Sequence, residues 1–115
     1  MDGFVRADDG VRLWCDDEGD GPAIVLSHGG PGMWDYLEPF AAALSPALRT
    51  VRWEQRGCGR SDATGPHTVA RTVDDLEAVR LGRGLERWIV AGHSWGATVA
   101  PVSYTHLTLP TILRV

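Results

Sequence analysis

Gly92-His93-Ser94-Trp95-Gly96 directly follows the apolar run Trp88-Ile89-Val90-Ala91. This order places a serine at the end of a buried strand, where the chain must turn sharply into a helix, and it predicts a nucleophile elbow. Such a tight reversal brings the backbone close to itself and strains the central residue, so the flanking positions favour glycine. We therefore expect the Ser94 hydroxyl to be exposed and to act as the catalytic nucleophile.

A second apolar run, residues 23–27, predicts another buried strand, and it ends in His28-Gly29-Gly30-Pro31-Gly32. Glycines after a strand leave backbone N–H groups free to face a ligand. Acyl transfer needs such donors, since each preorganised N–H group stabilises the oxyanion by about 3 to 4 kcal/mol. We expect the N–H groups of Gly30 and Trp95 to form the oxyanion hole.

Alternating strand and helix patterns predict an α/β protein with a mostly parallel sheet and crossover helices. An amino-terminal hairpin is expected over residues 4–15, and a further strand over residues 51–53. Apolar residues at helical spacing predict helices from residue 34 to Leu44 and from Val69 to Val79, with Phe40 on the buried face of the first. Trp34, Trp53 and Trp88 are expected to be core aromatics. Both glycine-containing turns then follow the carboxyl ends of strands, which is where ligands bind in open α/β sheets.

Three segments carry a resemblance to a known family: residues 28–32, residues 54–62 (Glu-Gln-Arg-Gly-Cys-Gly-Arg-Ser-Asp) and residues 92–96. Together they resemble the α/β-hydrolase superfamily, in particular its proline iminopeptidase (prolyl aminopeptidase) branch, over about residues 3 to 100. Glu54 stands where that branch usually has Asp, which keeps the charge. Gly92-His93 is closer to esterases and lactonases than to the Gly-Gly form of the branch. His93 is expected to have a structural role rather than to act as the base, and Arg56, Arg60 and Asp62 to form ion pairs and loop hydrogen bonds, with carboxylate binding as the alternative.

The resemblance implies a serine hydrolase that acts through an acyl-enzyme and removes amino-terminal residues, proline above all, from peptides. An esterase or lactonase of the same fold is the nearest alternative. In this superfamily the acid and the histidine of the triad follow the serine along the chain. After Ser94 the chain holds only His106 and no carboxylate. We therefore expect the 115-residue chain to be inactive, and its elbow strand to be an open, aggregation-prone edge.

Residues 101–115 are expected to be a non-native, artefactual tail. From Val102 to Thr111 the sequence reads as a translation of the transposon-end adapter used to prepare sequencing libraries. Index bases and further adapter bases account for the remainder up to a stop codon. We expect residues 1–100 to be the partial hydrolase core, and the tail to take no part in the native fold.

The net charge of −4 and the lack of a basic patch argue against nucleic acid as a partner. No apolar window is long enough for a membrane span and no signal peptide is recognisable, so a cytoplasmic protein with a peptide or small-molecule substrate is expected. Cys15 and Cys58 are predicted to be reduced structural thiols, and neither a cofactor nor a metal is expected.

Two other function classes remain open. Gly30 and Gly32 follow a strand and precede Glu54 by a spacing typical of dinucleotide-binding modules, although Asp35 stands where that fingerprint needs a small residue. An inert fragment without catalysis is the third possibility. Within the superfamily, Ser94 in place of Asp argues against epoxide hydrolases and dehalogenases.

Overall fold

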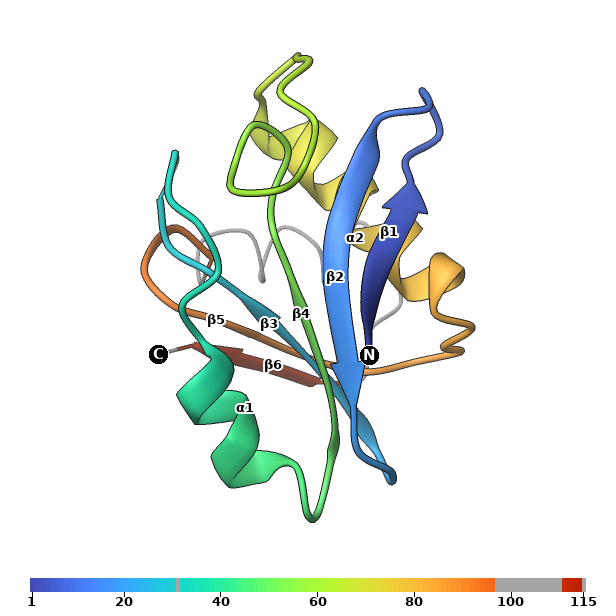
Figure 1. Cartoon of the computed structure of the whole chain (residues 1–115), viewed down its shortest axis with the longest axis vertical. Helices are drawn as coiled ribbons and strands as arrows, with labels where there is room; N and C mark the ends of the chain where they lie inside the picture. The colour runs from blue at the N-terminus through green and yellow to red at the C-terminus, as the bar shows by residue number, and fades with distance from the viewer. Residues whose placement is uncertain (31, 97–110, 115) are drawn as a thin grey trace.

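The computed structural model describes residues 1–30, 32–96 and 111–114. These residues form a six-stranded sheet in the order β1-β2-β4-β3-β5-β6, with two helices packed on it (Figure 1). β3, β4, β5 and β6 run parallel to one another, and the β1–β2 hairpin adds antiparallel strands at one edge. The predicted α/β architecture, a mostly parallel sheet with crossover helices, is confirmed.

β1 (Asp2–Arg6) and β2 (Arg12–Glu18) form the predicted hairpin. Val5 pairs with Leu13, and Gly10 takes the left-handed conformation in the connecting turn, with φ 88°. The far edge of β2 pairs antiparallel with β4 (Arg49–Trp53). The hairpin therefore extends the sheet on the side away from the elbow.

β3 (Ala23–Ser27) lies between β4 and β5 (Ile89–Gly92), and all five of its residues are buried. Its side chains alternate between two apolar clusters, since successive residues of a strand point to opposite faces. Val25 packs with the buried side of α2 (Val69–Gly82), whereas Ile24 and Leu26 pack with α1 (Glu38–Leu44). A continuous apolar run fits this position because both faces of the strand are covered.

α2 (Val69–Gly82) agrees with the predicted helix. Its first turn is capped by Thr68, whose side chain accepts a hydrogen bond from the Arg71 N–H at 3.1 Å. Val73, Leu76 and Val79 are buried at helical spacing. α2 therefore covers one face of the sheet.

α1 (Glu38–Leu44) is shorter than predicted and begins four residues after Trp34. Ala41 is its only fully buried residue, and it packs against Ile24 and Leu26. The prediction that Phe40 faces the core is wrong: its side chain is 47% exposed. Ala41 makes the close contact, and one residue turns the helix by about 100°, which places Phe40 at the rim.

The aromatic core contains two of the three tryptophans that were expected there. Trp53 and Trp88 are buried, at 0% and 2% exposure, but Trp34 is 58% exposed because it lies in the loop before α1. Cys15 and Cys58 are free, buried thiols. Within the described part of the chain, no helix has the length and apolar character needed to cross a bilayer.

The expected open edge at the elbow strand is not present. β6 (Thr111–Arg114) pairs in parallel with β5, and Val90 lies opposite Ile112. The physical reason is that an apolar strand with unpaired N–H and C=O groups is satisfied by any segment able to take a β conformation. Most of the predicted tail, residues 101–110 and 115, lies outside the described residues, and its artefactual origin stays a prediction.

Candidate active site

Ser94 occupies a strained turn at the carboxyl end of β5. Its φ is 56°, and among the described residues it is the only non-glycine residue with positive φ. β5 ends at Gly92, the helical conformation begins at Trp95, and Ser94 itself is exposed. A left-handed serine between a strand and a helix is the backbone geometry expected of a nucleophile elbow.

The flanking glycine Gly96 is required by close backbone contact. A Cβ added there would overlap the carbonyl oxygen of Ser27 and lie 2.7 Å from that of His28. Both carbonyls belong to the end of β3 and the turn that follows it. The elbow is therefore pressed directly against the glycine-rich segment.

Gly29 makes the reciprocal contact from the other side. A Cβ at Gly29 would lie 3.4 Å from the Ser94 Cβ and 2.6 Å from the Tyr36 hydroxyl oxygen. The loops after β3 and β5 thus leave the sheet at the same edge, as Figure 1 shows. The fold brings together two turns that lie far apart in the sequence and that the sequence singled out.

Both predicted oxyanion donors lie in these turns. Gly30 has φ 125°, a conformation that favours glycine, and directly follows Gly29. Trp95 is the first helical residue after Ser94, so its N–H is one of the donors that a helix leaves without an intrahelical acceptor. Their role in binding an oxyanion stays a prediction.

Tyr36 joins the two turns on one side of Ser94. Its hydroxyl oxygen accepts a hydrogen bond from the Gly29 N–H at 2.8 Å and lies 2.6 Å from the His93 Nδ1. The Tyr36 and His93 rings meet edge to face. His93 therefore has a structural partner, in line with the structural role favoured for it over that of a catalytic base.

Gln55 joins the two turns on the other side. Its side-chain oxygen accepts a hydrogen bond from the Trp95 indole N–H at 2.9 Å, and its side-chain amide donates to the His28 carbonyl, also at 2.9 Å. The Gln55 backbone N–H donates to the His28 Nε2 at 3.0 Å.

The imidazole of His28 is fully buried, which lowers its pKa. Because Nε2 accepts from the Gln55 N–H, the ring is neutral and carries its proton on Nδ1, which lies against the Gly29 carbonyl. His28 is therefore fixed within the glycine-rich segment and belongs to the structure of the turn.

Glu54 fastens the middle segment to the loop after β3. Its carboxylate accepts hydrogen bonds from the backbone N–H of Arg60 at 2.8 Å, from the Arg60 guanidinium at 2.7 Å and from the Asp35 N–H at 3.0 Å. Burial raises the pKa of Glu54, but these hydrogen bonds outweigh it, and the pKa lies below its usual value. A carboxylate at this position holds two loops together.

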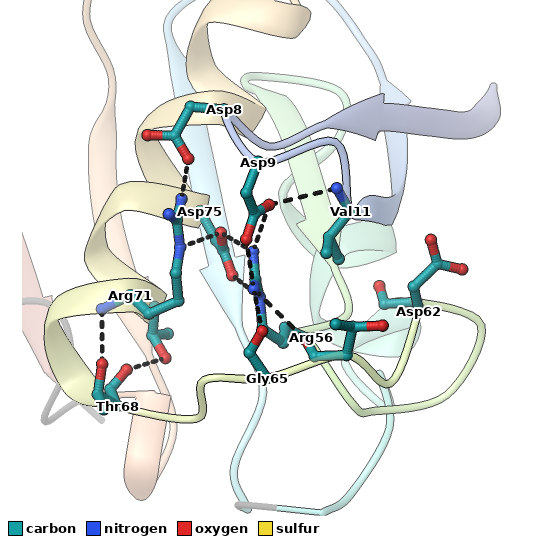
Figure 2. A network of polar contacts seen from close by, with 12 residues as sticks. Asp8, Asp9, Val11, Arg56, Asp62, Gly65, Thr68, Arg71 and Asp75 are labelled. Carbon is teal, nitrogen blue, oxygen red and sulfur yellow. Dashed lines mark hydrogen bonds and ion pairs between the residues drawn. The ribbon is translucent and has the colours of Figure 1, made fainter.

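Arg56 lies at the centre of a buried ion-pair network (Figure 2). Its side chain is 3% exposed and contacts Asp75 on α2 at 2.9 Å and Asp9 in the hairpin turn at 2.8 Å. It also donates to the Gly65 carbonyl at 3.0 Å. Arg71 contacts the same Asp75 carboxylate at 3.0 Å. The prediction of ion pairs and loop hydrogen bonds here is confirmed.

Two cavities adjoin the elbow. An apolar cavity of about 110 Å³ lies on the α1 face, and a larger one of about 320 Å³ lies on the other side. The smaller is lined by Leu26, Leu37, Phe40, Ala91, Gly92 and His93. The larger is lined in part by Trp95, Gln55, Cys58 and His67. The two cavities are thus lined by the chain neighbours of Ser94, the smaller by His93 and the larger by Trp95.

The geometry does not favour a dinucleotide site. That fingerprint needs the glycines to open a helix directly, whereas α1 begins at Glu38, six residues after Gly32. The Asp35 carboxylate is buried against the Arg52 guanidinium and holds the loop. Within the part of the chain that the structure describes, no group of three or more His, Cys, Asp or Glu side chains could hold a metal.

The sequence missed Tyr36 and Gln55 as members of the site. Gln55 lies in residues 54–62, one of the three segments that carry the family resemblance, but nothing in that segment indicates which loops its side-chain amide contacts. Tyr36 carried a weak signal, as a polar aromatic residue beside the apolar positions of the predicted helix. Both bridge segments that become neighbours only in the folded chain.

The comparisons with known proteins agree with this geometry. A model of the alpha/beta hydrolase fold family matches residues 22–101. The proline iminopeptidase of Xylella fastidiosa is 37% identical over 105 residues, which are 85% of this chain and 33% of that protein. A Mycobacterium bovis protein named "Probable oxidoreductase EphD" is 39% identical over 107 residues, which are 84% of this chain and 17% of that protein.

Solved structures extend the same picture. The proline iminopeptidase-related protein of Thermus thermophilus has a TM-score of 0.90 and 30% identity, over 99% of this chain and 43% of that one. Epoxide hydrolases and an esterase are also similar, at 22 to 29% identity. The chain thus spans about a third of the length of the iminopeptidase that it matches.

Proposed function

Because this chain belongs to the α/β-hydrolase fold family, we propose that it is part of a serine hydrolase whose acyl-enzyme forms on Ser94. The observation that carries the proposal is the left-handed Ser94, with φ 56°, set against the glycine-rich turn. Gly30 and Trp95 would donate their N–H groups to the oxyanion. The serine hydroxyl would lose its proton to a histidine held by an acid.

We infer a proline iminopeptidase-like aminopeptidase as the activity of the intact protein. The support is the combination of 37% identity to the Xylella enzyme with the three sequence segments that resemble this branch. An esterase or lactonase is the second candidate, favoured by Gly92-His93 before the serine. Epoxide hydrolases are disfavoured, because a hydroxyl at the elbow forms an acyl-enzyme where those enzymes use a carboxylate.

The 115-residue chain itself is proposed to be inactive. A serine hydroxyl is a weak nucleophile at pH 7 without an adjacent base. The described residues place Tyr36 and Gly29 around Ser94, and the His93 imidazole is hydrogen-bonded to Tyr36. A base would have to come from a segment that follows Ser94 in the intact protein.

The test begins with the source locus, sequenced outward from the codons for residues 94–100. The intact gene product is then assayed with proline p-nitroanilide, leucine p-nitroanilide and an aryl ester, beside its Ser94→Ala variant. The proposal predicts hydrolysis that depends on Ser94, with the highest kcat/KM on the prolyl substrate. Preference for the aryl ester would favour the esterase, and turnover unaffected by Ser94→Ala would refute a serine hydrolase.

A further inference from the structure

Two side chains tie the residues on either side of Ser94 to the glycine-rich turn. His93 is joined through Tyr36 to Gly29, and Trp95 is joined through Gln55 to His28. Each bridge runs from a neighbour of the proposed nucleophile to the segment that carries the proposed oxyanion donor Gly30. The arrangement is two-sided, with Ser94 between the bridges.

Tyr36 contacts both turns through its hydroxyl. Its hydroxyl oxygen accepts the Gly29 N–H, so its own proton is free to be donated to the His93 Nδ1. The Gly29 N–H is thereby occupied and turned toward Tyr36. The next N–H along the turn, that of Gly30, is left as the donor for an oxyanion.

The Gln55 bridge uses both ends of the amide. The oxygen accepts from the Trp95 indole, while the nitrogen donates to the His28 carbonyl. Gln55 is 4% exposed and His28 is fully buried, so water does not compete for the contact between them, whereas the Gln55–Trp95 contact is part-buried. The adjacent Arg56 is held by Asp75 and Asp9, which anchors the Gln55 backbone to α2 and to the hairpin (Figure 2).

The sheet alone does not set the distance between the two turns. Regular β3–β5 pairing ends at Ser27 and Gly92, and the last backbone hydrogen bond between the two segments, from the His93 N–H to the Ser27 carbonyl at 3.1 Å, precedes Ser94. An oxyanion hole works only when both donors lie within about 2.7 to 3.1 Å of the same oxygen. Beyond the sheet, that distance depends on the close packing at Gly96 and Gly29 and on the side chains that bridge the two turns.

We propose that Tyr36 and Gln55 are positioning residues that hold the Gly30 and Trp95 N–H groups at the separation an oxyanion requires. The inference rests on the proposed function, because it gives these residues a role in that same oxyanion hole. Neither side chain takes part in bond making or breaking. Each acts through the turn that it holds.

The test compares Tyr36→Phe and Gln55→Met with Ser61→Ala in the intact gene product. Ser61→Ala is the matched control, since it removes one buried hydroxyl that also makes two hydrogen bonds, with the Trp14 N–H at 2.9 Å and the Glu54 carbonyl at 2.5 Å. A displacement near 1 Å at a reacting centre costs on the order of 100-fold in rate. We expect kcat to fall about 10- to 100-fold in both bridge variants, with KM nearly unchanged. Ser61→Ala should lower the melting temperature and keep kcat.

A second readout keeps the inference separate from the proposed function. In ¹⁵N-labelled 115-residue protein, the amide resonances of Gly30 and Trp95 should shift in Tyr36→Phe and Gln55→Met but stay in place in Ser61→Ala. Resonances that do not move, or a kcat loss no larger than that of the control, would overturn the positioning role. A different outcome would refute the proposed function and leave the structural role of Tyr36 and Gln55 in place. In that outcome the resonances shift, but the intact wild-type protein shows no Ser94-dependent hydrolysis.

Discussion

Gly96→Ala should destabilise the protein, although alanine normally favours helices. Gly96 is helical and buried, and a new Cβ would overlap the Ser27 carbonyl and lie 2.7 Å from that of His28. Both carbonyl oxygens are backbone atoms, one in the last residue of β3 and one in the residue that follows it. β3 is hydrogen-bonded to a strand on each side, so these atoms cannot move away from a new Cβ. Overpacking typically costs about 1 to 3 kcal/mol, and with no flexible side chain to yield we expect about 3.

The sign of the change decides between two explanations. If helix propensity alone governed position 96, alanine would stabilise the protein by about 0.5 to 1 kcal/mol. Gly3→Ala is the matched control, since a Cβ there would make only ordinary contact, 3.6 Å from the Arg83 guanidinium, within strand β1. That variant should be neutral or more stable by a similar amount.

The assay is thermal unfolding followed by tryptophan fluorescence, because Trp53 and Trp88 are buried and report loss of the core. A domain of this size loses about 4 to 8 °C in melting temperature per kcal/mol. Gly96→Ala should therefore melt about 12 to 24 °C lower than wild type. Equal or greater stability of Gly96→Ala would show that the elbow is not pressed against the end of β3, and the reasoning would fail.

Four further predictions rest on the same geometry. Ser94→Gly should stabilise the chain by about 1 kcal/mol in urea unfolding, because glycine adopts the left-handed backbone conformation at φ 56° without strain. Unchanged stability would show that the turn is unstrained. Arg56→Met should destabilise the protein by about 3 kcal/mol, because the buried carboxylate of Asp75 loses its main partner. The double variant Arg56→Met with Asp75→Leu should recover part of this loss. A double variant as unstable as Arg56→Met alone would contradict the ion-pair explanation. Hydrogen bonds from Arg56 lower the pKa of Asp9 from 3.8 to about 2, so the stabilising contribution of Asp9 is complete above pH 3.8 and is lost as the pH falls toward 2. The difference in unfolding free energy between wild type and Asp9→Asn should therefore shrink between pH 3.8 and 2. A constant difference would disprove the linkage. Burial lowers the pKa of His28 below 6.5, so near that pH the unfolded chain binds a proton at His28 more readily than the folded chain does. The stability of the protein should therefore fall as the pH drops below 6.5. An NMR titration midpoint of His28 at or above 6.5 would refute this.

The sequence predicted the elements of this fold well where the pattern was local. Residues 23–27 form β3 with the predicted bounds, and α2 buries Val73, Leu76 and Val79 as expected. A continuous apolar run and a regular helical stripe each encode their burial within a few residues. The turn at Ser94 is equally local, because the glycines on either side and the strand before it are adjacent in the chain.

Predictions failed where burial depended on distant segments. Phe40 and Trp34 are exposed because Ala41 makes the contact of α1 with the sheet and the chain before Glu38 is a loop. The expected open edge of β5 is covered by β6, whose residues follow well after β5 in the chain. A residue's own type does not say which neighbour will cover it.

What the sequence by itself determined is the α/β class, the three segments that identify the hydrolase family, and the serine at the end of β5. Only the tertiary structure decided how those segments meet: Gly29 against Ser94, Gln55 between His28 and Trp95, and Tyr36 between Gly29 and His93. Strand and helix patterns arise from the spacing of residues that are close together in the sequence. A hydrogen bond between residues tens of positions apart exists only after the sheet has set the order of its strands, so the geometry of the proposed oxyanion hole is a property of the folded molecule.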